Sequence, residues 1–96
     1  MLARLTTTAK VPQGGGEILP KAQVVVTQPS HGQFKCFSAI CTHAGCLVGT
    51  VQNGAIICPC HGSQFSVKDG SVINGPATQP LPEYKITVKG TRIVRG

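Results

Sequence analysis

The stretch of sequence that decides the fold runs from residue 41 to residue 63 and reads CTHAGCLVGTVQNGAIICPCHGS. It begins with the pattern Cys-x-His, formed by Cys41 and His43, and ends with the pattern Cys-x-x-His, formed by Cys58 and His61. Thiolates and imidazoles are side-chain groups that bind transition metals. The stretch therefore predicts a metal site, provided that the chain brings its two ends together.

The residues between the two patterns indicate how the chain turns back to bring the patterns together. Fourteen residues separate His43 from Cys58, and they include Asn53-Gly54. Asn and Gly both tolerate positive φ, so this dipeptide is a strong signal for the two-residue turn of a β-hairpin. Strands over Leu47–Gln52 and Ala55–Cys58 would flank the turn. The hairpin predicts that the four ligand-type side chains converge from two loops.

The rest of the chain favours short antiparallel strands. Twelve glycines and seven prolines interrupt every stretch before it reaches helical length. Turns separate the apolar runs, which predicts strands over Gln23–Thr27, Gln33–Ile40, Gln64–Val67, Ser71–Ile73, Tyr84–Val88 and Thr91–Val94. We expect Pro12–Gly16 to be a linker or tight loop and the proline-rich Asn74–Pro82 to be a loop. The pattern predicts an all-β antiparallel sandwich or barrel, with residues 1–96 as a single domain.

The donor set alone is compatible with two kinds of site. Two thiolates and two imidazoles can hold one zinc ion in the tetrahedral arrangement of a structural module. The same donors can hold a [2Fe–2S] cluster in which two histidines replace two cysteines on one iron. The first alternative makes the chain a structural zinc module, and the second makes it an electron carrier.

The residues around the ligands resemble a known family. The boxes CTHAGC (41–46) and CPCHGS (58–63) resemble the two cluster-binding boxes of Rieske [2Fe–2S] proteins. Gly75-Pro76, within the segment NGPATQPLP (74–82), is similar to the proline loop that covers the third side of the cluster in that family. The resemblance spans about residues 36–82. It implies a Rieske fold, with the two ligand loops forming a cluster-binding subdomain, and one [2Fe–2S] cluster per chain.

The resemblance also assigns roles to individual residues. It implies four cluster ligands, two on each iron: Cys41 and Cys58 on the inner iron, and His43 and His61 on the outer iron at the protein surface. Cys46 and Cys60 match the cysteines that form a disulfide in the high-potential branch of the family. That pairing leaves Cys36, which the strand pattern predicts to be a buried small residue.

Three neighbouring positions bear on the reduction potential. Ser63 matches a family residue whose hydroxyl donates a hydrogen bond to a bridging sulfide, and such a bond raises the potential. Quinol-oxidising members usually carry Tyr at the position of Phe65, bonded to a ligand sulfur, and a large apolar residue at the position of Ala44. Phe65 and Ala44 depart from that pattern, which tilts the expectation away from quinol oxidation.

These features together predict one-electron transfer by an exported carrier or by a subunit of an oxidoreductase complex. The alternatives are the Rieske subunit of a quinol–cytochrome c reductase, in which quinol would be a partner, and the soluble ferredoxin of a dioxygenase. The expected partners are redox proteins such as cytochromes, oxidases or reductases. We expect no catalytic site within the chain, because a mononuclear iron site needs two further histidines and only His31 remains.

Charge and hydropathy limit the possible binding partners and the cellular location. Nine Lys and Arg against three Asp and Glu give a net charge of +6, but these residues are scattered singly along the chain. We therefore expect no nucleic-acid binding; a solvated surface is the simplest interpretation, and an acidic redox partner is an alternative. A structural disulfide implies an oxidising compartment. No run of about 20 apolar residues is present, so we expect an exported domain whose signal or N-terminal membrane anchor lies outside this sequence.

Overall fold

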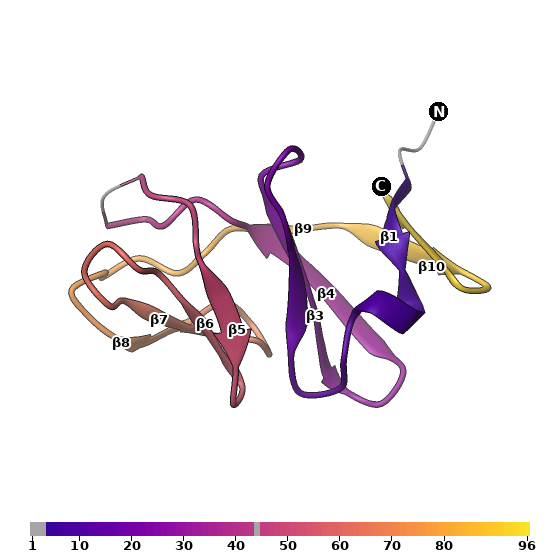
Figure 1. Cartoon of the computed structure of the whole chain (residues 1–96), viewed down its shortest axis with the longest axis horizontal. Coiled ribbons are helices and arrows are strands. Elements are labelled where there is room, and N and C mark those ends of the chain that lie inside the picture. Colours follow the sequence, from indigo (N-terminus) through magenta and orange to yellow (C-terminus); the bar gives the residue numbers. More distant parts are fainter. Residues whose placement is uncertain (1–3, 44) are drawn as a thin grey trace.

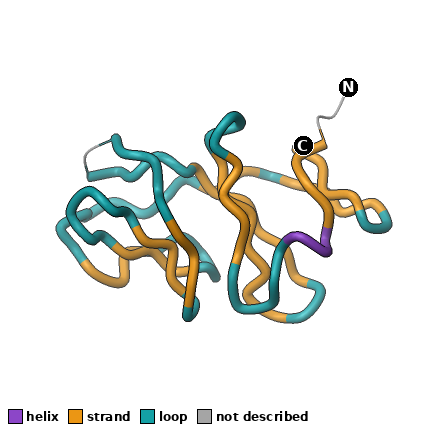
Figure 2. The backbone as a smooth tube through the Cα atoms, viewed as in Figure 1, coloured by secondary structure: helices purple, strands orange, loops and turns teal. Residues whose placement is uncertain are grey.

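The computed structural model describes residues 4–43 and 45–96. Its elements are β1 (Arg4–Thr7), η1 (Thr8–Lys10, one turn of 3₁₀ helix), β2 (Gly16–Leu19), β3 (Val24–Ser30), β4 (Gln33–Ser38), β5 (Thr50–Gln52), β6 (Ala55–Ile57), β7 (Gln64–Ser66), β8 (Val72–Asn74), β9 (Glu83–Tyr84), β10 (Ile86–Lys89) and β11 (Arg92–Arg95). Strands and loops account for almost all of the described backbone (Figure 2). The antiparallel all-β prediction is confirmed. No helix within the described residues is long and apolar enough to cross a membrane.

The described strands form three antiparallel sheets along an elongated molecule of 38 × 26 × 17 Å. A central sheet has the order β2-β3-β4-β9, a terminal sheet has the order β1-β11-β10, and the third sheet has the order β5-β6-β7-β8. Figure 1 shows the β5–β8 sheet and its loops at one end of the long axis, and the sheet that carries both chain ends at the other. We call the two ends the loop end and the terminal end.

The central sheet is covered on both faces, which explains the run of three valines in β3. Val24 and Val26 contribute to one buried cluster together with Cys36 and Ile93, on the side of the terminal sheet. Val25 points the other way, into the cluster shared with the β5–β8 sheet. Successive strand residues alternate between faces, so a strand buried on both sides is apolar throughout.

Several strand boundaries differ from the sequence prediction. Strand β3 continues through Ser30, so only His31 and Gly32 form the turn to β4. The segment predicted as one strand over Tyr84–Val88 is divided into β9 and β10, which belong to different sheets. Strands β1 and β2 were not predicted. The predicted Asn53-Gly54 turn is confirmed, since both residues have positive φ, 53° and 77°, between β5 and β6.

The glycine-rich segment before β2 is a tight loop, which resolves the alternative left open by its composition. The Gly14 N–H donates to the carbonyl of Gln28, and the Gln28 N–H donates to the carbonyl of Gly15. At Gly16 a Cβ atom would lie 2.6 Å from the Val26 carbonyl oxygen. Only glycine lets β2 approach β3 at this point.

Candidate metal centre

The two ligand boxes fold into loops with the same hydrogen-bond pattern. In the first loop the Cys41 N–H donates to the Cys46 carbonyl (2.7 Å), and the Gly45 N–H donates to the Cys41 carbonyl (2.9 Å). In the second loop the first residue, Cys58, and the glycine four residues later make the equivalent bonds, of 2.8 and 3.1 Å. Both glycines have positive φ, 72° and 80°. A glycine four residues after each cysteine is the sequence signal for this equivalence, and it formed no part of the prediction.

The loops bring the four predicted ligands together as two pairs. Cys41 and Cys58 are each 1% exposed, and their thiols contact one another. His43 and His61 are exposed, with ring centroids 4.9 Å apart and ring planes at 89°. No three or more His, Cys, Asp or Glu side chains in the described part of the chain are grouped closely enough to share a single metal ion. The arrangement therefore consists of a buried thiol pair beside an exposed imidazole pair.

The electrostatics of the thiol pair depend on its burial. Burial raises the pKa of the Cys58 thiol, and the neighbouring Cys41 thiol raises it further. The backbone N–H groups of Cys60 and His61 donate to the Cys58 sulfur and lower the pKa. Two adjacent buried sulfurs can both be thiolates only where a cation compensates their charge. The donor set and the amides directed at the sulfur thus fit a metal centre in which two thiolates bind one metal and two imidazoles bind another.

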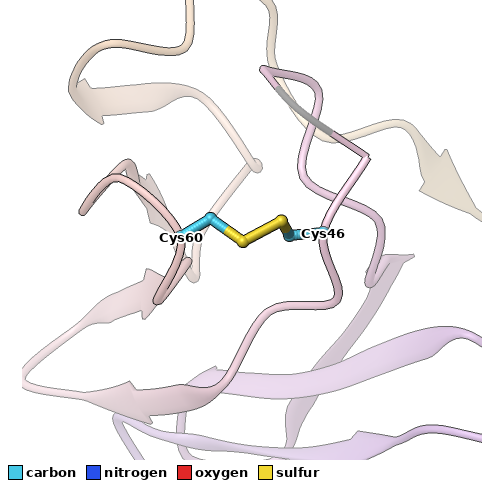
Figure 3. Close-up of a disulfide and its surroundings, with 2 residues drawn as sticks. All are labelled: Cys46 and Cys60. Atoms are coloured by element: carbon cyan, nitrogen blue, oxygen red, sulfur yellow. A yellow bond between two sulfur atoms is a disulfide. The ribbon is translucent and has the colours of Figure 1, made fainter.

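A disulfide joins the two loops. It links Cys46 to Cys60, whose Cα atoms are 6.5 Å apart. Figure 3 shows the bridge running from one loop to the other. The pairing implied by the family resemblance is therefore present in the structure. Because Cys60 lies between Cys58 and His61, the bridge holds this second pair of predicted ligands against the first loop.

The proline loop makes hydrogen bonds to residues of both ligand boxes. Gly75-Pro76 is a cis peptide bond in this loop. The next residue, Ala77, is buried, and its N–H donates to the Ser63 hydroxyl oxygen at 3.1 Å. Ser63 is 1% exposed, and because its oxygen accepts this bond, the hydroxyl proton remains able to donate elsewhere.

A hydrogen bond that was not predicted from the sequence joins the proline loop to the first ligand loop. The Thr42 hydroxyl donates to the carbonyl of Gln79 at 2.6 Å. Thr42 lies between the two ligand-type residues of the first box. Its hydroxyl was a signal available in the sequence, although the acceptor 37 positions away was not.

The structure also gives the positions of other residues discussed in the sequence analysis. Phe65 in β7 is fully buried, in the same apolar cluster as Cys41 and Cys58. Cys36 is fully buried in the cluster on the other face of the central sheet, as predicted, and burial raises the pKa of its thiol to about 11. His31 is exposed in the β3–β4 turn. Ala44 lies outside the described residues.

Comparison with known proteins identifies the family. The family model for the Rieske [2Fe-2S] domain matches residues 5–85. The chain is 41% identical over 86 residues to the cytochrome b6-f complex iron-sulfur subunit of Chlorobaculum tepidum, a match that covers 88% of this chain and 47% of that protein. The chain spans about half the length, or less, of the first curated relatives it matches.

Solved structures show the same fold. The plasma membrane Rieske protein PetC3 from the cyanobacterium Synechocystis PCC 6803 aligns with a TM-score of 0.79 and 34% identity, over 98% of both chains. The ferredoxin of carbazole 1,9a-dioxygenase from Nocardioides aromaticivorans aligns with a TM-score of 0.78 at 24% identity, over 99% of this chain and 96% of that one, which shows a shared fold alone.

The fold and the paired thiols and imidazoles define an all-β electron-transfer domain. With the family match, the chain belongs to the Rieske [2Fe-2S] domain family, whose members bind one [2Fe–2S] cluster. This family is not a zinc family, so the zinc alternative that the donor set left open is not retained.

Proposed function

We propose that Cys41, His43, Cys58 and His61 are the ligands of the [2Fe–2S] cluster. The observation that carries the assignment is the separation of the four side chains into a buried thiol pair and an exposed imidazole pair. When bound, the cluster accepts and releases one electron at a time. The two thiolates cancel the positive charge of the oxidised iron–sulfide core and the neutral imidazoles add none, which favours a higher potential than four thiolates give.

The exposed imidazoles supply the contact with redox partners. His43 and His61 both reach solvent, so an electron can leave through a ring edge without a path through the protein. Each ring also keeps one N–H beyond the nitrogen used for iron. This N–H can donate a hydrogen bond to a redox partner at the protein surface.

Replacement of single histidines tests the ligand assignment. His43→Ala and His61→Ala should each abolish binding of iron and labile sulfide. His31→Ala is the matched control, because it removes an exposed histidine from the β3–β4 turn and should retain about two irons per chain. Iron content, labile sulfide content and the visible spectrum of the three variants show whether His43 and His61 are needed for cluster binding. Two irons per chain in either His43→Ala or His61→Ala would remove that residue from the ligand set.

We further propose that the whole chain, residues 1–96, works as one exported electron carrier. The Cys46–Cys60 bridge supports an oxidising, extracytoplasmic compartment. The similarity to a plasma membrane Rieske protein, at 34% identity, supports a carrier that works at a membrane. Fractionation of host cells, followed by thiol labelling before and after lysis, tests the location. Recovery in the cytosol with Cys46 and Cys60 reduced would contradict the proposal.

A second candidate is a Rieske subunit of a quinol-oxidising complex. The 41% identity to a cytochrome b6-f complex iron-sulfur subunit favours it. Deleting this chain's gene from the host separates the two candidates. Loss of quinol–cytochrome reductase activity from membranes supports the subunit, whereas unchanged activity supports the separate carrier.

A further inference from the structure

The charge of the molecule is segregated between its two ends. Eight of the nine basic residues lie outside residues 40–82, the segment that forms the loop end. Within that segment the only charged side chains are Lys68 and Asp69, which offset one another. The net charge of +6 therefore belongs to residues 1–39 and 83–96, which supply the central and terminal sheets and the segments that connect their strands. Scattered along the sequence, these residues gave no sign of a patch.

The terminal sheet collects three of the cations on one face. Lys89 in β10 is directly opposite Arg92 in β11, and Arg4 in β1 is directly opposite Val94 in β11. Directly opposed residues share a face, as do Arg92 and Val94, which are two positions apart. The intervening Ile93 points into the core. Arg4, Lys89 and Arg92, which we call the basic face, are therefore on the outer side of the sheet, and all three are exposed.

Among the described residues, no acidic side chain forms an ion pair with the basic face. In the part of the chain that the structure describes, the one ion pair joins Lys35 to Glu83. The third acid of the chain, Glu17, accepts a hydrogen bond from Thr6. Like charges directly opposed across two strands are destabilising, so the Lys89–Arg92 pair weakens the folded chain unless an anion lies against it.

An apolar groove adjoins the basic face and indicates which kind of anion would bind there. Its volume is about 460 Å³, and it is lined by Leu5, Leu19 and Pro20, with Arg4 and Lys21 among the other lining residues. Arg4 belongs to both the groove and the basic face. Cations beside an apolar recess suit an amphiphilic anion, such as a phospholipid, better than a fully polar acidic surface.

We propose that the basic face and its groove dock on an anionic phospholipid surface. The attraction is electrostatic and acts within about one Debye length, roughly 8 Å at physiological salt. Figure 1 shows the terminal sheet and the loop end at opposite ends of the long axis. Docking through the basic face therefore keeps the loop end, which carries the exposed His43 and His61, at the far end of the long axis from the lipid, where a redox partner can reach it.

Vesicle binding by the whole cluster-containing chain tests the proposal. The probes are vesicles of phosphatidylcholine alone and of phosphatidylcholine with 30% phosphatidylglycerol, sedimented at low and at physiological salt. The test variant is Lys89→Gln with Arg92→Gln. The matched control is Lys35→Gln with Lys68→Gln, which removes the same two charges from sites that each lie beside an acid. An intact visible spectrum verifies the fold of each variant.

The expected result is binding to the anionic vesicles only, weakened by salt. Each cation near an anionic surface contributes about fivefold to partitioning, so the test variant should bind about 25-fold more weakly while the control stays close to the native chain. Equal weakening in both variants would overturn the proposal, because it would mean that net charge alone matters. No binding to anionic vesicles would also overturn it, and would leave an acidic protein as the occupant. Neither failure touches the proposed cluster ligands.

Discussion

Replacing Phe65 by tyrosine tests how the protein sets the reduction potential. Phe65 is fully buried in the apolar cluster that also holds Cys41 and Cys58. If its ring edge faces a ligand sulfur, Phe65→Tyr adds a hydroxyl that donates to that sulfur. The reduced cluster carries the larger negative charge, so the new bond stabilises it more than it stabilises the oxidised form.

The size of the effect follows from the charge difference. A hydrogen bond to a charged group contributes about 1.5–3 kcal/mol, of which we assign about 1 kcal/mol to the difference between the redox states. For a one-electron couple, about 59 mV corresponds to 1.4 kcal/mol. Phe65→Tyr should therefore raise the potential by about 40 mV. The stability of the fold should change little, because the buried hydroxyl has an acceptor.

Voltammetry at one pH, with a visible spectrum to verify the cluster, measures the shift. Phe37→Tyr is the control, because Phe37 is equally buried in the same cluster but lies on β4, with its ring against Gly70. It should leave the potential unchanged and cost about 1–3 kcal/mol in stability, since its hydroxyl gains no sulfur acceptor. An unchanged or lowered potential in Phe65→Tyr, with the cluster intact, would refute the reasoning.

Three further outcomes are expected. Replacing Cys46 and Cys60 by serine should loosen the ligand loops and lower the free energy of unfolding by about 3 kcal/mol. In the unsubstituted protein, labelling after denaturation and removal of the cluster, without a reductant, should find three free thiols and not five. Burial raises the pKa of Cys36 from 9.0 to about 11, so the thiol's contribution to the free energy of unfolding should be complete below pH 9 and should fall by about 3 kcal/mol once the pH passes 11. Chemical denaturation of Cys36→Ala should show a smaller decline with pH than the unsubstituted protein, and an equal decline would contradict this prediction. Gly62→Ala should cost about 1–2 kcal/mol from positive φ alone, because its Cβ would meet nothing within 4 Å, whereas Gly75→Ala, without positive φ, should be nearly neutral.

The candidate centre could be predicted because its determinants are local in sequence. Each ligand-type pair lies within one short box, and the Asn53-Gly54 turn needs only the φ preferences of its own two residues. The disulfide followed from the family resemblance, and the structure contains it. The Thr42–Gln79 hydrogen bond could not be predicted in the same way, because its acceptor is a backbone carbonyl placed by the proline loop.

The terminal sheet was harder to predict because long-range pairing decides it. Strand β1 pairs with β11 from the opposite end of the chain, and β2 depends on the close approach that Gly16 allows. Strand preference of this kind reflects packing against neighbours more than local sequence. The basic face could not be predicted for the same reason, since Arg4 and Arg92 are far apart in the sequence and come together in one sheet only because β1 pairs with β11.

The shared geometry of the two ligand loops explains why the thiols are buried and the imidazoles exposed. In each loop the first cysteine both donates and accepts the bonds that close the loop, so it stays at the base, next to the buried sheet residues. His43 and His61 follow two and three residues later, on the part of the loop that turns outward, and both are exposed. The disulfide and the proline loop then fix one loop against the other. Exposure of the proposed ligands His43 and His61 is therefore set within residues 41–82. The terminal sheet can thus carry the basic face without altering the proposed ligands.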